Sequence, residues 1–335
     1  MLRGMGSDVS ESSSESSSES SAMELGLVAS TGSAPMDALV QGALARVLVA
    51  LPDRLRAVYA LGSYADESAV STSDLDLVFI VADGFRDDEQ ARVQAILAEC
   101  AARAEGELDG EVMDEAGLAA GVSPTLKLGS HLLWGEDVRQ RLPLMPLATW
   151  TRDRMHTSYW RLAGLFARPA PLTMPLNFPD PGDEFYGYAR RLVHLPDGAL
   201  EPGTRDLMRA VGWMATALLA YQTGQYVATK RACATMYRAH IGDEWGDLLD
   251  DLALWVRGAW QYRIPAAPED HARLRAICAH TLAFENHFLA RYQRYTLAEL
   301  RGNDPEGRRA ALEAQRRIPL ADAEMMRAVA EAARH

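Results

Sequence analysis

The spacing of apolar residues predicts alternating helices and strands in the first part of the chain. Residues 36–52, MDALVQGALARVLVALP, carry apolar residues at helical spacing and end at a proline. Two largely apolar runs at 57–63 and 74–83 predict strands, and helical spacing returns over 87–104. Residues 107–118 alternate polar and apolar side chains and predict a third strand. The order helix, strand, strand, helix, strand indicates a small α/β unit.

The second part of the chain has a different pattern. Residues 159–185 are rich in proline and aromatic residues, and their end predicts a linker or a loop. Long amphipathic stretches follow at 204–224, 245–262 and 269–300, none of which alternates like a strand. The tail, 304–335, predicts one or two shorter helices. This pattern is typical of a helical bundle.

These patterns predict an α+β fold with a leader and two domains. A small α/β domain with a mixed sheet is expected over 35–150, and an all-α helical bundle domain over 151–335. The leader, 1–34, contains the tract SESSSESSSESS, which has nothing to bury and is therefore expected to be disordered. A phosphorylated or solubilising tail, a vector-derived segment and a start codon placed too far upstream all remain open for it.

Composition and charge limit the partners. The chain has 335 residues, 48% apolar and 24% charged, and a net charge of −12 from 34 basic and 46 acidic residues. This acidity disfavours nucleic acid, which needs basic patches, and allows either a cationic substrate or an ordinary acidic surface. The three cysteines are scattered, and no apolar run reaches the roughly 18 residues of a membrane span. A cytoplasmic protein without a membrane partner is expected, and the oligomeric state stays open.

Two aspartates lie where the second predicted strand begins. Alternate residues of a strand project to one face, so Asp74 and Asp76 point the same way, about 7 Å apart. Leu75 and Leu77 then point into the core. Two ionised carboxylates repel each other unless a cation lies between them, and oxygen ligands suit Mg²⁺. The pair therefore predicts a magnesium site, against the alternative of a solvated strand end.

A third carboxylate on a neighbouring strand would complete such a site. The third predicted strand offers Glu107, Asp109 and Glu111 on one face, and Asp109 and Glu111 lie nearest its middle. Asp109 is the first choice as a metal ligand or catalytic base, with Glu111 as the alternative. Asp114 has the opposite parity and is expected to mark the end of the strand.

A glycine and a serine precede these acids. Gly62 and Ser63 follow the first predicted strand, and Ser-Asp-Leu-Asp-Leu opens the second. Glycine allows close approach of the backbone to a phosphate, and serine adds a hydroxyl and an amide donor. Gly-Ser alone is common, whereas Gly-Ser followed by Asp-x-Asp between two apolar strands is far more specific.

The stretch LGSYADESAVSTSDLDLVFIV, 61–81, resembles the signature of the polymerase-β-type nucleotidyltransferase superfamily. The resemblance covers about residues 37–116. It implies that Gly62 and Ser63 hold nucleotide phosphates and that Asp74 and Asp76 bind Mg²⁺, with two ions expected. The implied reaction transfers a nucleoside monophosphate from a triphosphate to a hydroxyl and releases pyrophosphate.

A second resemblance narrows the group. HLLWGEDVRQRLP, followed by LLAYQTGQYVATKRACATMY and GDEWGDLLDDL, is similar to aminoglycoside adenylyltransferases that act on streptomycin and spectinomycin. It implies that ATP lies between the two domains and that Lys230 contacts its phosphates. The base of those enzymes is a glutamate on the third strand, and Glu107, Asp109 or Glu111 could take its place here.

The leading hypothesis is a Mg²⁺-dependent adenylyltransferase that modifies a hydroxyl of a small molecule, with an aminoglycoside antibiotic as the candidate acceptor. One alternative is a nucleotidyltransferase of the toxin–antitoxin type that modifies a protein or tRNA. The other is an inactive nucleotide-binding regulatory protein, against which the intact Asp-x-Asp counts.

Overall fold

The computed structural model describes residues 26–104, 108–195 and 198–334. The serine-rich tract and Glu107 lie outside these residues. The first part of the chain contains, in order, α1 (Ala34–Ala50), β1 (Leu55–Leu61), η1 (Gly62–Tyr64), β2 (Leu75–Val81), α2 (Glu89–Arg103), β3 (Leu108–Asp114), α3 (Glu115–Leu118), α4 (Pro124–Gly129) and β4 (His131–Gly135).

The four strands form one mixed sheet in the order β3-β2-β1-β4. Strand β1 is antiparallel to both β2 and β4, whereas β2 and β3 are parallel and are joined through α2. Each β2 residue therefore has a fixed partner on β3, which decides which side chains stand together on one face.

Each face of the sheet has its own hydrophobic cluster. On one face, alternate β2 residues such as Leu75 and Leu77, 0% and 2% exposed, pack with Val40 of α1 and Leu97 of α2. On the other face, Val78 and its same-parity neighbours pack against residues 118–142. The prediction that Leu75 and Leu77 face the core is confirmed. The even-numbered positions of β2, Asp76 included, belong to the opposite face.

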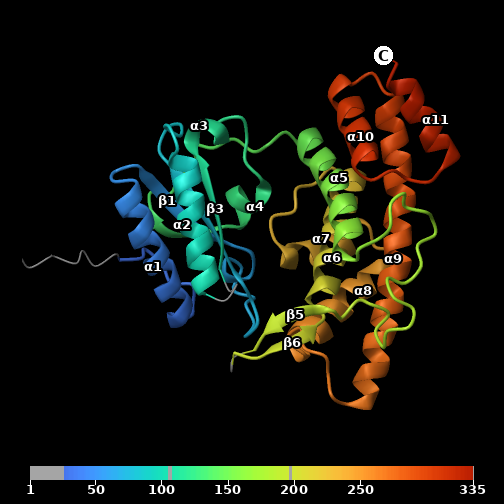
Figure 1. The fold of residues 1–335 in the computed structure, drawn as a ribbon, viewed down its shortest axis with the longest axis horizontal. Helices are drawn as coiled ribbons and strands as arrows, with labels where there is room; N and C mark the ends of the chain where they lie inside the picture. The colour runs from blue at the N-terminus through green and yellow to red at the C-terminus, as the bar shows by residue number, and fades with distance from the viewer. Residues whose placement is uncertain (1–25, 105–107, 196–197, 335) are drawn as a thin grey trace, which may run out of the picture.

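The second part of the chain is mostly helical and lies on the right of Figure 1. It contains α5 (Leu147–Leu165), β5 (Arg191–His194), β6 (Leu200–Gly203), α6 (Arg205–Thr223), α7 (Lys230–His240), α8 (Trp245–Asp251), the π-helical η2 (Leu252–Ala259), α9 (Pro268–Arg301), α10 (Pro305–Arg317) and α11 (Ala323–Ala332).

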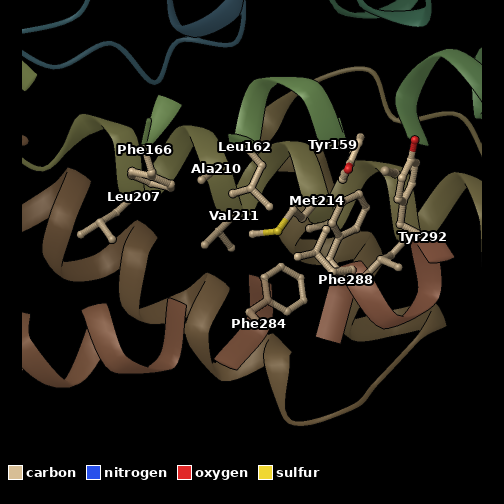
Figure 2. Close-up of a cluster of buried hydrophobic side chains, with 14 of the residues drawn as sticks. Tyr159, Leu162, Phe166, Leu207, Ala210, Val211, Met214, Phe284, Phe288 and Tyr292 are labelled. Carbon is tan, nitrogen blue, oxygen red and sulfur yellow. The ribbon is translucent and has the colours of Figure 1, made fainter. Parts of the chain in front are cut away.

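The helical part has a separate core centred on α5, α6 and α9. Figure 2 shows Leu162 of α5 and Met214 of α6 meeting Phe284 and Phe288 of α9, all of them buried. Tyr159 stacks on Tyr292 of α9 with ring centroids 4.2 Å apart. This packing fixes α5 against α6, and these two helices form one wall of the cleft described below.

The predicted α+β class is confirmed: a mixed four-stranded sheet with helices precedes a mostly helical region. The helices α3, α4 and α5 were not predicted as separate elements, and neither were three of the strands. Strand β4 and the antiparallel β5–β6 hairpin have only four or five residues per strand, which is too short for alternation to be recognised. Among the described residues, no helix combines the length and the apolar character needed to cross a membrane.

Residues 26–33, which the sequence assigned to the leader, contact the first part of the chain. The amide of Val28 donates to the carbonyl of Leu133 at 2.8 Å. The carboxylate of Asp37 accepts hydrogen bonds from the backbone and side chain of Thr31, at 2.7 and 2.8 Å. These contacts hold the segment before α1 against β4 and the first turn of α1.

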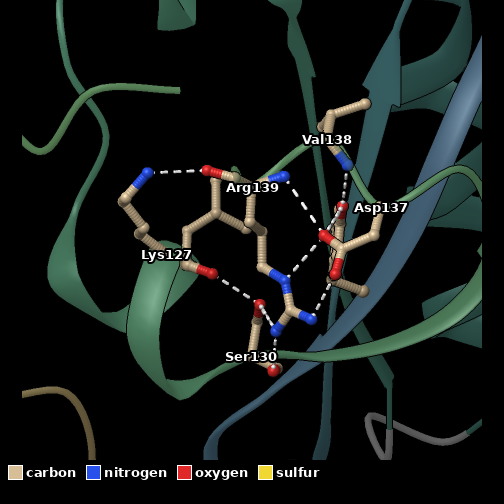
Figure 3. Close-up of polar contacts among 7 residues, drawn as sticks. Lys127, Ser130, Asp137, Val138 and Arg139 are labelled. Atoms are coloured by element: carbon tan, nitrogen blue, oxygen red, sulfur yellow. Dashed lines mark hydrogen bonds and ion pairs between the residues drawn. The ribbon is translucent and has the colours of Figure 1, made fainter. Parts of the chain in front are cut away.

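A polar network fastens α4 and the end of β4 to the sheet (Figure 3). The phenol of Tyr59 on β1 accepts from the amide of Val138 and donates to the carboxylate of Asp137. Arg139 reaches both Asp137 and the carbonyl of Ser130, while Lys127 of α4 donates to the carbonyl of Arg139 at 2.7 Å. The network fixes α4, whose N-terminal residues line the cleft.

Candidate active site

Gly62 lies at the point where β1 turns into η1. Its φ of +63° is favoured by glycine, and a Cβ at this position would lie 2.7 Å from Oδ2 of Asp76. Because Leu61 pairs with Asp76 across β1 and β2, the turn passes directly beside that carboxylate. The predicted glycine and the second aspartate are therefore in contact range.

Asp76 and Asp109 are register partners on the parallel strands β2 and β3. Paired residues on neighbouring strands lie about 4.8 Å apart and share a face. The next pair on that face is Val78 with Glu111. The parity expected from the sequence is therefore observed, and three carboxylates gather at one edge of the sheet.

Asp74 has a different environment. Its Oδ2 forms ion pairs with Arg205 at 3.0 Å and with Arg209 at 3.1 Å, both on α6. The sequence predicted a Mg²⁺ ion between Asp74 and Asp76; in the structure two arginines pair with Asp74, while Asp76 still experiences the charge of Asp74. Burial would raise the pKa of Asp74, but the two guanidinium groups outweigh it and lower that pKa overall.

The loop between Ser63 and Asp74 is docked on the helical part. Arg257 of η2 donates to the carbonyl and hydroxyl of Ser68, at 2.5 and 2.8 Å. Thr72 donates to the carbonyl of Gln261 at 2.8 Å, and Val70 packs against the helical core. The spacer between Gly-Ser and Asp-x-Asp thus joins the two parts of the chain.

Lys230 begins α7, and its approach to the sheet depends on a close backbone contact. A Cβ on Gly129, at the end of α4, would lie 2.6 Å from the carbonyl oxygen of Ala228. Thr229 caps α7 by accepting from the amide of Ala232 at 3.1 Å. Gly129 therefore lets the segment before Lys230 lie against α4, and the lysine side chain lines the cleft.

These elements enclose a cleft of about 720 Å³ between the sheet and the helices. Its acidic lining residues are Asp76, Asp109 and Glu111, all from the sheet. Its basic lining residues are Arg154 and Arg161 of α5, Arg209 of α6, and Lys230. We call these two sets the acidic sheet wall and the basic helical wall.

A small recess adjoins the cleft. It is lined by Ser63, Ser73, Asp74, Arg205, Met208, Arg209, Lys230, Arg257 and Tyr262. Arg209 and Lys230 line both spaces, so the recess continues from the cleft. Ser63 and Asp74 therefore face the recess, whereas Gly62, Asp76, Asp109 and Glu111 face the cleft.

The charges of the sheet wall are incompletely balanced. Burial raises the pKa of Asp76 to about 6, and the neighbouring Asp74 adds to the increase, although Lys230 opposes it. Burial raises the pKa of Glu111, and Asp109 adds to the effect. Among the described residues, the Asp76 carboxylate has no hydrogen bond and no ion pair within 4 Å. A cation at this edge would relieve the excess negative charge.

Lys230 faces these acids from the helical wall. The residue has exposed surface, while desolvation by the surrounding walls lowers the pKa of its amine, an effect that Asp76 and Asp74 partly counter. It is one of two lysines in the chain, the other being Lys127.

The donor set at the sheet edge suits a hard divalent cation such as Mg²⁺, which prefers carboxylate oxygens. Asp76 and Asp109 are the paired candidates, and the uncompensated charge of Asp76 is the feature that a cation would satisfy. Over the residues that the structure describes, no three acidic, histidine or cysteine side chains form a complete metal cluster. Phosphate oxygens and water would have to supply the remaining ligands, which is usual for Mg²⁺.

The basic helical wall was missed, except for Lys230. Arg205 and Arg209 are spaced i, i+4, which places them on one helix face. That spacing is a visible signal, but it does not indicate which carboxylate the face meets. Arg154 and Arg161 also share a helix face through their i, i+7 spacing, whereas Arg257 has no such neighbour; which space these arginines face depends on helix packing.

Comparison with known proteins gave only distant similarities. No family model matches the chain, and no curated protein sequence matches it. A crystal structure of the spectinomycin adenyltransferase AAD(9) from Enterococcus faecialis with ATP and spectinomycin aligns with a TM-score of 0.40 and 12% identity, over 73% of this chain and 97% of its own. A toxin–antitoxin structure with AMP-PNP aligns with a TM-score of 0.23 and 16% identity, over 37% of this chain and 94% of its own. At this level of similarity, the functional assignment depends on the cleft itself.

Proposed function

We propose that the chain is a Mg²⁺-dependent nucleotidyltransferase that transfers AMP from ATP to a hydroxyl of a small molecule. The observation that carries the proposal is the opposition of the two walls across one cleft. Carboxylates for a divalent cation stand on the sheet, and cations for phosphates stand on the helices. A magnesium triphosphate needs both, because its metal seeks carboxylate oxygens while its phosphates seek basic groups.

Each wall has a separate task in this proposal. Asp76 and Asp109 would hold Mg²⁺. Asp74 would become a further ligand when Arg209 pairs with the nucleotide phosphates instead of with Asp74. Gly62 and Ser63 would offer backbone and hydroxyl donors to the phosphates, and Lys230 would bind them from the opposite wall. A bound Mg²⁺ neutralises phosphate charge and makes the acceptor hydroxyl more acidic.

The proposed transfer is a direct displacement. The acceptor oxygen forms a bond to the α-phosphorus of ATP, and the bond from that phosphorus to the bridging oxygen breaks. The electron pair of that bond leaves with pyrophosphate, and the hydroxyl proton passes to Glu111 or Asp109. Burial raises the pKa of Glu111, which suits a carboxylate that takes up a proton. Catalysis would come mainly from positioning and charge neutralisation.

The test uses the full chain and ATP labelled at the α-phosphate. The protein is incubated with Mg²⁺, labelled ATP and a pool of hydroxylated small molecules, and pyrophosphate and labelled products are measured. The expected result is pyrophosphate release in step with one labelled small-molecule product. Asp88→Asn, an exposed carboxylate paired with Arg92 on α2, serves as the matched control for Asp76→Asn.

The other outcomes separate the alternatives. Label transferred to an added protein or tRNA fraction would favour the toxin–antitoxin type of enzyme. Tight binding of ATP without release of pyrophosphate across the pool would favour an inactive nucleotide-binding protein. Full turnover by Asp76→Asn would show that the sheet wall is not the reaction site.

A further inference from the structure

One face of α5 presents arginines to the cleft. Arg154, Ser158 and Arg161 follow at i, i+4 and i+7 and all line the cleft, with Trp150 one turn earlier. The hydroxyl of Ser158 donates to the carbonyl of Trp213 on α6 at 2.9 Å, which fixes this face relative to α6. The helix therefore holds two guanidinium groups toward the open space.

Within the described ranges, Arg161 forms no ion pair with an acidic side chain. The Nε of Arg154 donates to the carboxylate of the adjacent Asp153 at 3.0 Å. Among the described residues, no carboxylate lies within 4 Å of Arg161, whose guanidinium carbon is 5.0 Å from the ring centroid of Trp213. An arginine keeps its charge under all ordinary conditions, so Arg161 is a cation at the cleft wall on which the carboxylate of Asp153 acts only from beyond ion-pair distance.

Arg154 and Arg161 line the cleft but not the recess. The recess contains Ser63, Arg205 and Arg257 but neither of the α5 arginines. In the proposed function, the triphosphate lies between the Gly62–Ser63 turn and Lys230, where cleft and recess meet. The α5 face is then left for the acceptor.

The sign of the charge on this face bears on the class of acceptor. All the acidic lining residues of the cleft, Asp76, Asp109 and Glu111, belong to the sheet edge. A polycationic acceptor such as an aminoglycoside would bring ammonium groups toward Arg154 and Arg161 without meeting carboxylates on that wall. An anionic group would instead accept paired N–H donors from Arg161, the geometry in which guanidinium recognises carboxylate and phosphate.

We propose that the acceptor is a hydroxylated small molecule that carries a carboxylate or a phosphate, and that Arg161, supported by Arg154, binds this anionic group. The inference rests on the proposed function and replaces a cationic antibiotic by an anionic acceptor. The transferred AMP goes to the neutral hydroxyl, as in the displacement above, and the anionic group stays unchanged. Its role is to hold the hydroxyl at the sheet wall.

The first test uses inorganic phosphate and acetate as probes of the two anionic groups. The full chain is saturated with Mg²⁺ and an ATP analogue with a methylene group between the α- and β-phosphates, and each probe is titrated. We expect at least one probe to bind and Arg161→Gln to weaken its binding at least tenfold. Arg161→Lys should retain part of the affinity, and Arg92→Gln on α2 should have no effect. The preferred probe shows whether the site takes a phosphate or a carboxylate.

The second test compares acceptors that differ in charge. Glucose, glucosamine, glucuronate, glucose 6-phosphate and spectinomycin are offered with labelled ATP, and any turnover should be confined to the two anionic sugars. Binding of neither probe by the wild type, or equal binding by Arg161→Gln, would overturn the proposal, as would turnover of glucosamine or spectinomycin.

The affinity for the ATP analogue distinguishes failure of the acceptor proposal from failure of the proposed function. If Arg161→Gln weakens binding of the analogue tenfold, Arg161 belongs to the nucleotide site, and the acceptor proposal fails while the proposed function stands. If the wild type binds no analogue, the proposed function itself fails.

Discussion

The two walls of the cleft carry opposite charges and are built in different ways. The sheet wall takes its three carboxylates from β2 and β3, where strand register places them side by side. The helical wall takes its four cations from α5, α6 and the start of α7, which meet through side-chain packing. Register fixes positions along a strand within a short sequence, whereas helix packing joins residues far apart in the chain.

The walls also differ in how their charges are balanced. Asp74 and Arg209 neutralise each other across the junction, yet over the described part of the chain neither Asp76 on one wall nor Arg161 on the other forms an ion pair. Unpaired charges destabilise a folded chain unless something else compensates them. Their presence in one cleft is the reason for proposing that ligands of both signs bind there.

The largest expected effect comes from the sheet wall. Asp76→Asn should lower turnover on the order of 10³-fold, because it removes the main proposed carboxylate for Mg²⁺. Steady-state pyrophosphate release measures this change. Without ligand, the free energy of unfolding of Asp76→Asn should be about 1 kcal/mol higher than that of the wild type, since the substitution removes an uncompensated carboxylate whose pKa is raised to about 6. A variant that is both less stable and fully active would contradict this role.

A substitution in the basic helical wall should change the affinity for the nucleotide more than the rate of turnover. Lys230→Met should weaken binding of the ATP analogue about 10- to 30-fold, the effect of losing one charge-assisted contact. Isothermal titration measures the dissociation constant. Lys127→Met is the matched control, because Lys127 donates to the carbonyl of Arg139 and lies in the network of Figure 3. Unchanged affinity in Lys230→Met would remove the lysine from the nucleotide site.

Asp74 links the two walls, and its removal should act opposite to that of Asp76 on stability. Asp74→Asn should lower the free energy of unfolding by about 1–2 kcal/mol, because Arg205 and Arg209 lose their shared carboxylate. Urea unfolding without ligand measures the difference. If Asp74→Asn and Asp76→Asn changed stability in the same direction, the two aspartates would not differ as described.

The smallest expected effect concerns the turn between the walls. Gly62→Ala should cost about 1 kcal/mol of stability because of its positive φ. It should also reduce turnover, since the added Cβ would displace the Asp76 carboxylate. Gly32→Ala is the matched control: Gly32 has a φ of +83°, but a Cβ there would meet no atom within 4 Å. Equal turnover in both variants would show that the turn at Gly62 does not contribute to the reaction.

The difference between the walls explains which residues of the candidate site could be placed from the sequence. The period of a strand placed Asp74 with Asp76 on one strand and Asp109 with Glu111 on another, and the register of β2 with β3 then pairs Asp76 with Asp109. Arg161 and Arg209 could not be placed, because their position depends on α5 packing against α6 and on the docking of the 63–74 loop at Arg257. Lys230 was found through a resemblance and not through a local pattern.

Protection of Lys230 from acylation tests most directly whether a magnesium nucleotide binds between the two walls. The chain contains only two lysines, so the reaction at Lys230 can be compared with that at Lys127 in the same sample. The full protein is treated with an amine-acylating reagent, and mass spectrometry measures the rates at Lys230 and Lys127 with and without Mg²⁺ and ATP. If a magnesium nucleotide joins the two walls, ATP slows acylation of Lys230 at least tenfold in the wild type, less in Asp76→Asn, and leaves Lys127 unchanged. Equal rates at Lys230 with and without ATP would contradict the account.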